Sequence, residues 1–231
     1  MTKLSQAIAL ATAMTAGLAI TTTAQAEVEV AASAAVSNMY LWRGQDLGQD
    51  TNGTTGGVPA ISGDLTVSAS GAYAGVWTSS GDASNGQEYD LYVGYGMEAG
   101  EVALDISYWT YIYPGADNDD IADLHEIIAS AAFKGASLGV YYNIDQDEDD
   151  QTDYFYTTLG YEYNQFSATY GIQTYSDTED GDYSHINLSY AYNDNLSFTL
   201  SQIVSADLDE DENGLDRSPK VVVTYSLPIE L

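Results

Sequence analysis

Apolar residues recur at every second position in segments of about ten residues along most of this chain, and this alternation restricts its fold. The clearest segment is 88–97, in which one face carries Tyr89, Leu91, Val93, Tyr95 and Met97. The other face of the same segment carries Glu88, Asp90, Tyr92, Gly94 and Gly96. A period of two is that of a β-strand whose two faces meet different surroundings. The alternation therefore predicts an all-β protein.

Twelve segments of this kind follow one another along the chain. They are 28–43, 61–69, 71–79, 88–97, 101–113, 124–134, 136–145, 153–163, 166–175, 183–192, 196–206 and 219–227. The face that points inward is ambiguous in the first, third and sixth segments, because their alanines and serines mark neither side.

The connections between these segments alternate in length. The short ones lie around residues 70–71, 98–100, 135, 164–165 and 193–195. The long ones are 44–60, 80–87, 114–123, 146–152, 176–182 and 207–218. Membrane barrels have short periplasmic turns and long external loops. The spacing predicts an antiparallel up-and-down transmembrane β-barrel of about twelve strands, with both termini on the periplasmic side.

Acidic residues dominate the charge of the chain. It has 35 Asp and Glu against 5 Lys and Arg, a net charge of −30. Many of the acids fall in the predicted external loops, which are therefore expected to be acidic, as in 145–153 and 207–216. Such a charge excludes nucleic acid as a partner and favours cations. There is no cysteine, so no disulfide stabilises the fold.

The N-terminus has the features of a signal peptide over residues 1–26. Lys3 precedes an apolar, small-residue stretch, and residues 24–26 (AQA) fit a signal-peptidase site. A retained anchor is the alternative, but the apolar stretch is short for a membrane span. We expect residues 27–231 to form one barrel domain in the bacterial outer membrane. Its expected partners are outer-membrane lipid and, during assembly, the insertion machinery.

Tyrosines and tryptophans gather toward the ends of the predicted strands. Examples are Tyr40, Trp42, Trp77, Tyr108, Trp109, Tyr111, Tyr113, Tyr161, Tyr163, Tyr190 and Tyr192. Such residues form girdles at the level of the lipid headgroups. A tyrosine-rich core of a soluble β-sandwich is the alternative interpretation.

Three stretches resemble the Gcw_chp family, also called TorF-type porins. They are residues 40–44 (YLWRG), 71–77 (GAYAGVW) and 88–95 (EYDLYVGY), in the order found in that family. The resemblance implies a small exported barrel described as a porin, without an established solute. One departure is the C-terminus, which ends in LPIEL rather than on the aromatic residue usual in outer-membrane barrels.

Several charged residues are expected to face the lumen. The lumen and constriction candidates are Arg43, Asp64, Asp90, Asp105, Glu126, Glu162 and His185. Arg43 is expected either to pair with an inward acid and hold the wall together, or to form a constriction that selects solutes.

Two further patterns could indicate a catalytic site or a metal site, but each is incomplete. His185, Asn187 and Ser189 share one face, but residues four apart on a strand lie too far apart for a nucleophile and its base, so we expect no enzyme. Asp209, Asp211 and Asn213 match the first half of a calcium loop, but Lys220 stands where its glutamate belongs. We expect no cofactor, and at most weak divalent-cation binding by the external loops.

The sequence leaves three functions open. The first is a porin for passive diffusion of small solutes, with a preference for cations. The second is a non-conducting structural or adhesive barrel whose acidic loops are its working surface. The third, disfavoured by the spacing above, is a barrel hydrolase.

Overall fold

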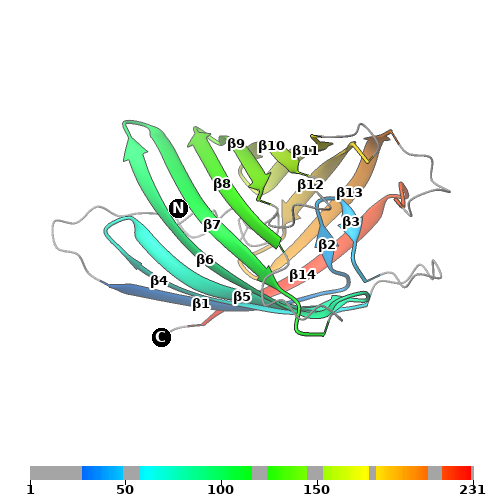
Figure 1. The fold of residues 1–231 in the computed structure, drawn as a ribbon, viewed down its shortest axis with the longest axis horizontal. Coiled ribbons are helices and arrows are strands. Elements are labelled where there is room, and N and C mark those ends of the chain that lie inside the picture. The colour runs from blue at the N-terminus through cyan, green and yellow to red at the C-terminus, as the bar shows by residue number, and fades with distance from the viewer. Residues whose placement is uncertain are drawn as a thin grey trace.

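The described residues of the chain, in a computed structural model, are 28–48, 58–115, 124–144, 153–176, 181–207 and 215–229. Across these ranges, twelve strands form a closed antiparallel barrel (Figure 1). They are β1 (Glu29–Ser37), β4 (Ala60–Ala69), β5 (Ala72–Asp82), β6 (Gly86–Ala99), β7 (Val102–Ile112), β8 (Leu124–Phe133), β9 (Ala136–Asn143), β10 (Tyr154–Tyr163), β11 (Phe166–Tyr175), β12 (Tyr183–Ala191), β13 (Leu196–Ala206) and β14 (Lys220–Ile229). No helix long and apolar enough to cross a membrane occurs in these ranges.

Each barrel strand pairs with its neighbour along the chain, and the first strand closes the barrel against the last. Ala32 of β1 pairs with Ile229 of β14, and Ser37 pairs with Thr224. The other edge of β1 pairs with β4, where Glu29 lies opposite Ser68. The predicted all-β, up-and-down barrel of twelve strands is confirmed.

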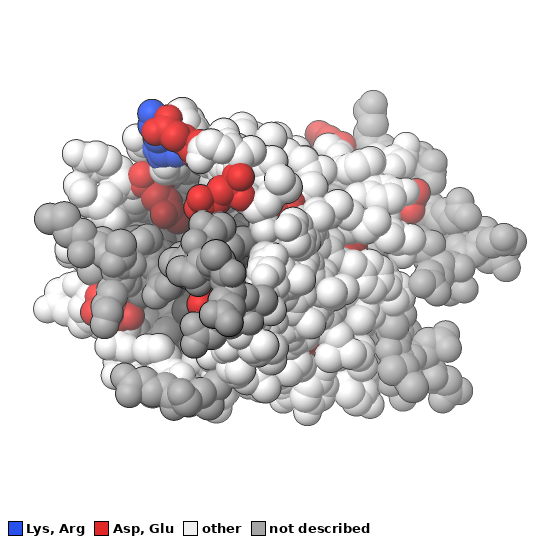
Figure 2. Space-filling model, turned by 90° about the vertical axis from the view of Figure 1, so that its left-hand side faces the viewer, with Lys and Arg blue, Asp and Glu red and all other residues white. Residues whose placement is uncertain are grey.

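The two faces of the wall differ as the alternation predicts. In β6, Leu91 is 48% exposed on the outside, whereas Asp90 and Tyr92 on either side of it are 0% and 6% exposed inside. In β12, Leu188 is 51% exposed, whereas His185 and Ser189 are buried inside. Over the face seen in Figure 2 most of the surface is uncharged, and charged side chains gather in a few places. An apolar exterior around a polar interior is the arrangement of a transmembrane barrel.

The predicted first strand, 28–43, is wrong at its C-terminal end. β1 ends at Ser37, and the chain then leaves the wall to form a separate hairpin of β2 (Leu41–Trp42) and β3 (Gln45–Asp46). Asn38 fixes the point of departure, because its side chain donates to the Val221 carbonyl and accepts from the Val223 amide, at 3.0 and 2.6 Å.

The turn of this hairpin consists of Arg43 and Gly44. Both have positive φ, 48° and 84°, as a two-residue type I′ turn requires. The Leu47 amide donates to the Tyr40 carbonyl at 2.9 Å and closes the loop. Residues 40–47 are called the lumen hairpin below.

The predicted long connection 80–87 is also wrong. Strand β5 continues to Asp82 and β6 begins at Gly86, so only residues 83–85 join them. One carboxylate oxygen of Asp82 accepts hydrogen bonds from the amides of Ser84 and Asn85, both at 2.8 Å. The side chain of Asp82 thus makes a tight turn where composition indicated a loop.

Only some of the residues predicted to form the aromatic girdle lie on the outside of the barrel. Tyr108, Tyr161, Tyr163 and Tyr192 lie on the outside and are exposed. Tyr40, Trp109 and Tyr111 are buried inside the barrel, and Trp77 and Tyr113 pack against the same interior cluster. Adjacent residues on a strand point to opposite faces, so Tyr108 and Trp109 cannot both belong to an outer girdle.

Candidate functional site in the barrel lumen

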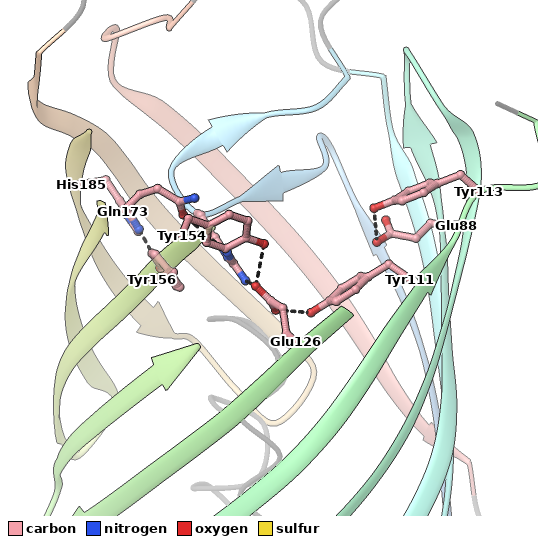
Figure 3. A network of polar contacts seen from close by, with 9 residues as sticks. Glu88, Tyr111, Tyr113, Glu126, Tyr154, Tyr156, Gln173 and His185 are labelled. Carbon is pink, nitrogen blue, oxygen red and sulfur yellow. Dashed lines mark hydrogen bonds and ion pairs between the residues drawn. The ribbon is translucent and has the colours of Figure 1, made fainter. Parts of the chain in front are cut away.

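The lumen hairpin spans the barrel from one wall to the opposite wall (Figure 3). At one end the Tyr40 hydroxyl donates to Glu88 Oε2 on β6 at 2.5 Å. At the other end Gln45 Nε2 donates to the Tyr183 hydroxyl on β12 at 2.9 Å. Since β6 and β12 lie half-way round the strand order from each other, these two contacts anchor the hairpin across the lumen.

The Arg43 side chain at the turn reaches Glu126 on β8. Arg43 Nη2 donates to Glu126 Oε1 at 2.5 Å, and Nη1 lies 3.5 Å from Gln173 Oε1 on β11. The Glu126 side chain is completely buried. Its oxygens also accept hydrogen bonds from the hydroxyls of Tyr111, at 2.6 Å, and Tyr154, at 2.8 Å. Three donors therefore satisfy one buried carboxylate.

Aromatic rings surround the Arg43 guanidinium. Its central carbon lies 4.3 Å from the ring centroid of Trp42, 4.4 Å from Tyr156, 5.1 Å from Tyr141 and 5.4 Å from Tyr154. These distances lie within the range of cation–π attraction. Burial lowers the pKa of Arg43, but the charge of Glu126 together with Tyr154 and Tyr111 raises it by more, and the net effect is a pKa well above its usual value.

The contact between Tyr40 and Glu88 depends on a protonated phenol. Burial, followed by the charge of Glu88, raises the pKa of the Tyr40 hydroxyl well above its usual value. Tyr113 donates a second hydroxyl to Glu88, at 3.0 Å. At this end the lumen hairpin is therefore anchored to a carboxylate that accepts hydrogen bonds from two phenol hydroxyls.

His185 on β12 supports the turn of the hairpin. Its Nε2 lies 2.8 Å from the Tyr156 hydroxyl, and its Nδ1 lies 3.2 Å from Asn187 Oδ1. A Cβ added to Gly44 would stand 2.7 Å from the Cβ of His185, so only glycine fits at this position of the turn. Ser189 instead bonds Thr199 at 2.8 Å, and both ring nitrogens of His185 have other partners. His185, Asn187 and Ser189 therefore lack the hydrogen bond between serine and histidine that a catalytic triad needs.

The structure brings only some of the predicted lumen residues together. Arg43, Glu126 and His185 belong to the network around the hairpin turn. Asp64 accepts from Tyr92 at 2.7 Å, and Asp105 accepts from Tyr73 at 2.9 Å, each apart from that network. Glu162 lies opposite Ser167 in the register, near the turn that joins β10 and β11.

Asp90 differs from the other inward carboxylates. It is completely buried, no tyrosine hydroxyl or other donor group of the described residues reaches its carboxylate oxygens, and its side chain interacts with the Glu88 carboxyl. It lies two residues from Glu88 on the same face of β6 and opposite Tyr111 in the register.

Several sequence expectations lie outside the described residues. These are the signal peptide, the half calcium loop with Asp209, Asp211 and Asn213, and most of the acidic loop residues. Within the part of the chain that the structure describes, no group of three or more His, Asp or Glu side chains could hold a metal ion.

No role of Tyr154, Tyr156 or Gln173 was expected from the sequence, and Tyr111 was expected in the outer girdle rather than at Glu126. The alternation placed Tyr154 and Tyr156 inside, but their partners lie on other strands and no local pattern identifies them. Gly44 was a partial signal, since glycine is favoured at hairpin-turn positions that need a positive φ, whereas Arg43 is not a typical residue there.

The three family-like stretches meet inside this barrel. Tyr40 of the first stretch contacts Trp77 of the second, with ring centroids 6.0 Å apart, and bonds Glu88 of the third. A family model described as "Bacterial protein of unknown function (Gcw_chp)" matches residues 21–219. The chain belongs to the Gcw_chp family.

Among solved structures, this Gcw_chp chain is similar to one titled "KdgM porin". The two are 7% identical, with a TM-score of 0.47, over 88% of this chain and 99% of that chain. No curated protein matches the Gcw_chp chain significantly.

Proposed function

We propose that this Gcw_chp protein is an outer-membrane channel for small solutes, in which the lumen hairpin forms the constriction. The observation that carries the proposal is a closed barrel with an apolar exterior and a polar interior that the hairpin crosses. A barrel of this kind needs lipid around its wall and the insertion machinery to reach the membrane.

We expect the channel to prefer cations. The inward carboxylates include Asp64, Asp90, Asp105 and Glu126, whereas Arg43 and Lys220 are the inward cations of the described strands and hairpin. Rings of acidic side chains favour the passage of cations. The acidic loops of the sequence add charge of the same sign outside the barrel.

A non-conducting barrel is the second candidate, and one observation favours it. At the level of the hairpin, Tyr111, Glu88, Glu126 and Asp90 are all less than 2% exposed, so the side chains there fill part of the lumen. Such a barrel would serve as an anchor or adhesive surface through its external loops.

Conductance measurements in planar bilayers distinguish the two candidates. Refolded protein should produce stepwise current, because water and ions can pass a polar lumen. The same preparation unfolded by heat serves as the control. Absence of current from protein shown to be folded would exclude the channel and favour the anchoring barrel. Fractionation of cells should recover the protein with the outer membrane, and recovery in the periplasm would contradict the membrane location.

A further inference from the structure

The surroundings of the Arg43 guanidinium are supplied almost entirely by the barrel wall. Glu126 comes from β8, Tyr154 and Tyr156 from β10, and Gln173 from β11 (Figure 3). Tyr141 comes from β9. Only the ring of Trp42 belongs to the hairpin itself. These five wall residues are called the guanidinium cage below.

Three residues of the guanidinium cage, Glu126, Tyr154 and Tyr156, have hydrogen bonds that do not involve Arg43. Glu126 is fixed by the hydroxyls of Tyr111 and Tyr154. Tyr156 bonds His185 and stacks on its ring with an interplanar angle of 5°. His185 in turn contacts Asn187. Removal of the arginine would therefore leave Glu126, Tyr154 and Tyr156 with their own partners, whereas Gln173 would lose its contact with Arg43.

The chemistry of the guanidinium cage suits a planar organic cation. A guanidinium group offers N–H donors in a plane and is weakly hydrated, so it pairs with a carboxylate and stacks on aromatic rings. A metal ion would require more oxygen ligands than one carboxylate and one amide supply.

The hairpin that delivers Arg43 is not part of the barrel. β2 and β3 pair only with each other, in a sheet separate from the wall. Arg43 itself adopts a positive φ of 48°, which costs free energy for a residue other than glycine. Withdrawal of the hairpin turn would leave the wall pairing intact.

We propose that the guanidinium cage is a binding site for solutes that carry a guanidinium group, and that Arg43 occupies it until such a solute displaces it. A group tethered by a short flexible linker acts at an effective concentration of about millimolar, and Arg43 on its ordered hairpin acts at this concentration or above it. Solutes that reach this range compete with Arg43. Weak binding of this kind is what passage through a channel requires. The role in transport rests on the proposed channel function, whereas binding can be measured on the folded barrel without any current.

The test uses the full barrel refolded in detergent, with Arg43→Ala to empty the cage. Methylguanidinium chloride should stabilise this variant in urea titrations, with about an elevenfold rise in the folding equilibrium constant at ten times Kd. Tetramethylammonium chloride has the same charge but no N–H donor, and it should have no such effect at equal ionic strength.

Two further variants make the result specific. Arg43→Ala combined with Glu126→Gln removes the carboxylate and should abolish the stabilisation by methylguanidinium. Lys134→Gln is the matched control, because Lys134 is an exposed cation paired with Glu101 at 3.1 Å and leaves no buried site. Its stability should respond less to methylguanidinium than that of Arg43→Ala, because Arg43 still competes for the cage. An equal response in the combined variant, or no response in Arg43→Ala, would overturn the proposal.

The remaining outcomes also test the binding site and the channel. If Arg43→Ala does not fold alone, methylguanidinium should restore its folding, and failure to do so counts against the cage. Conductance of the unmodified protein is measured separately. Binding without current would retain the site and exclude the channel, whereas current without binding would retain the channel and exclude the site.

Discussion

The surroundings of Arg43 favour arginine over lysine, because its neighbours interact with both the charge and the planar shape of the guanidinium group. Glu126 is buried completely and pairs with the charge, while Trp42 and Tyr156 lie against the guanidinium at 4.3 and 4.4 Å. Lysine could pair with the carboxylate, but it has no planar face for the rings. The pair was one of the two roles expected for Arg43 from the sequence, and its role as a constriction stays a prediction.

At the residue scale, Gly44→Ala should destabilise the lumen hairpin. The new Cβ would meet the Cβ of His185 at 2.7 Å, in a residue with a φ of +84°. Gly100→Ala is the matched control, because Gly100 has a φ of +69° but no atom within 4 Å of an added Cβ. We expect a loss of about 1 kcal/mol in the control from backbone strain alone. The loss in Gly44→Ala should be about 2–4 kcal/mol, since crowding adds to the strain.

Urea titration of the two refolded variants gives the comparison. Equal losses would show that the contact between Gly44 and His185 does not hold the hairpin turn.

At the element scale, the strands of the barrel wall and those of the lumen hairpin are held in place by different kinds of contact. The twelve barrel strands are tied by a continuous ladder that closes between β1 and β14. The lumen hairpin is tied to them mainly by side chains, at Glu88, Glu126 and Tyr183. One main-chain contact, from the Ala83 amide to the Leu47 carbonyl at 2.8 Å, joins it to the turn between β5 and β6.

Replacement of residues 40–47 by a Gly-Ser segment of the same length should therefore leave the barrel folded and widen the path. We expect single-channel conductance to rise several-fold, because the hairpin no longer crosses the lumen. Gln165→Gly, in the turn between β10 and β11, is a control that does not touch the lumen hairpin. Conductance of the two variants is compared in the same bilayer, and an unchanged value for the hairpin variant would show that the hairpin does not limit the current.

At the scale of the whole molecule, the outer face of the barrel wall is apolar, and the acidic side chains of the strands lie in the lumen or at the strand ends. The charged side chains of the barrel strands point inward or lie at strand ends, as with Asp64, Asp105 and Glu126. Inside, carboxylates accept hydrogen bonds from tyrosine hydroxyls in four places, at Asp64, Glu88, Asp105 and Glu126. Phenols thus satisfy most of these buried acids in place of cations.

The cation preference should depend on salt if the external acids contribute to it. Neutralisation of Asp147, Glu148, Asp149 and Asp150 to their amides should lower the preference at low salt, because a rim of one sign concentrates counter-ions. Little change is expected at 1 M salt, where the screening length is about 3 Å.

Reversal potentials across a salt gradient measure this preference. The control replaces the three aspartates of this group by glutamate, which keeps the charge and should keep the preference. Anion preference in the unmodified protein would contradict the assignment.

The sequence by itself determined the strands and, except in the first, third and sixth segments, the faces they present, because a period of two is a local property of each strand. Segment 88–97 points Asp90 and Tyr92 inward as the alternation requires, and segment 183–192 does the same with His185. The predicted ends of 166–175 and 196–206 coincide with those of β11 and β13. The exceptions arose where side chains bond the backbone, at Asn38 and Asp82, since one such contact ends or extends a strand.

Only the tertiary structure decided what fills the lumen. Arg43 and Glu126 lie 83 residues apart in the chain, and they meet because barrel closure brings β8 within reach of the segment that follows β1. The same closure selects which tyrosine donates to which carboxylate, as between Tyr40 and Glu88. Alternation along a strand specifies only inside and outside, whereas pairing across a lumen depends on strand number, stagger and the path of one short hairpin.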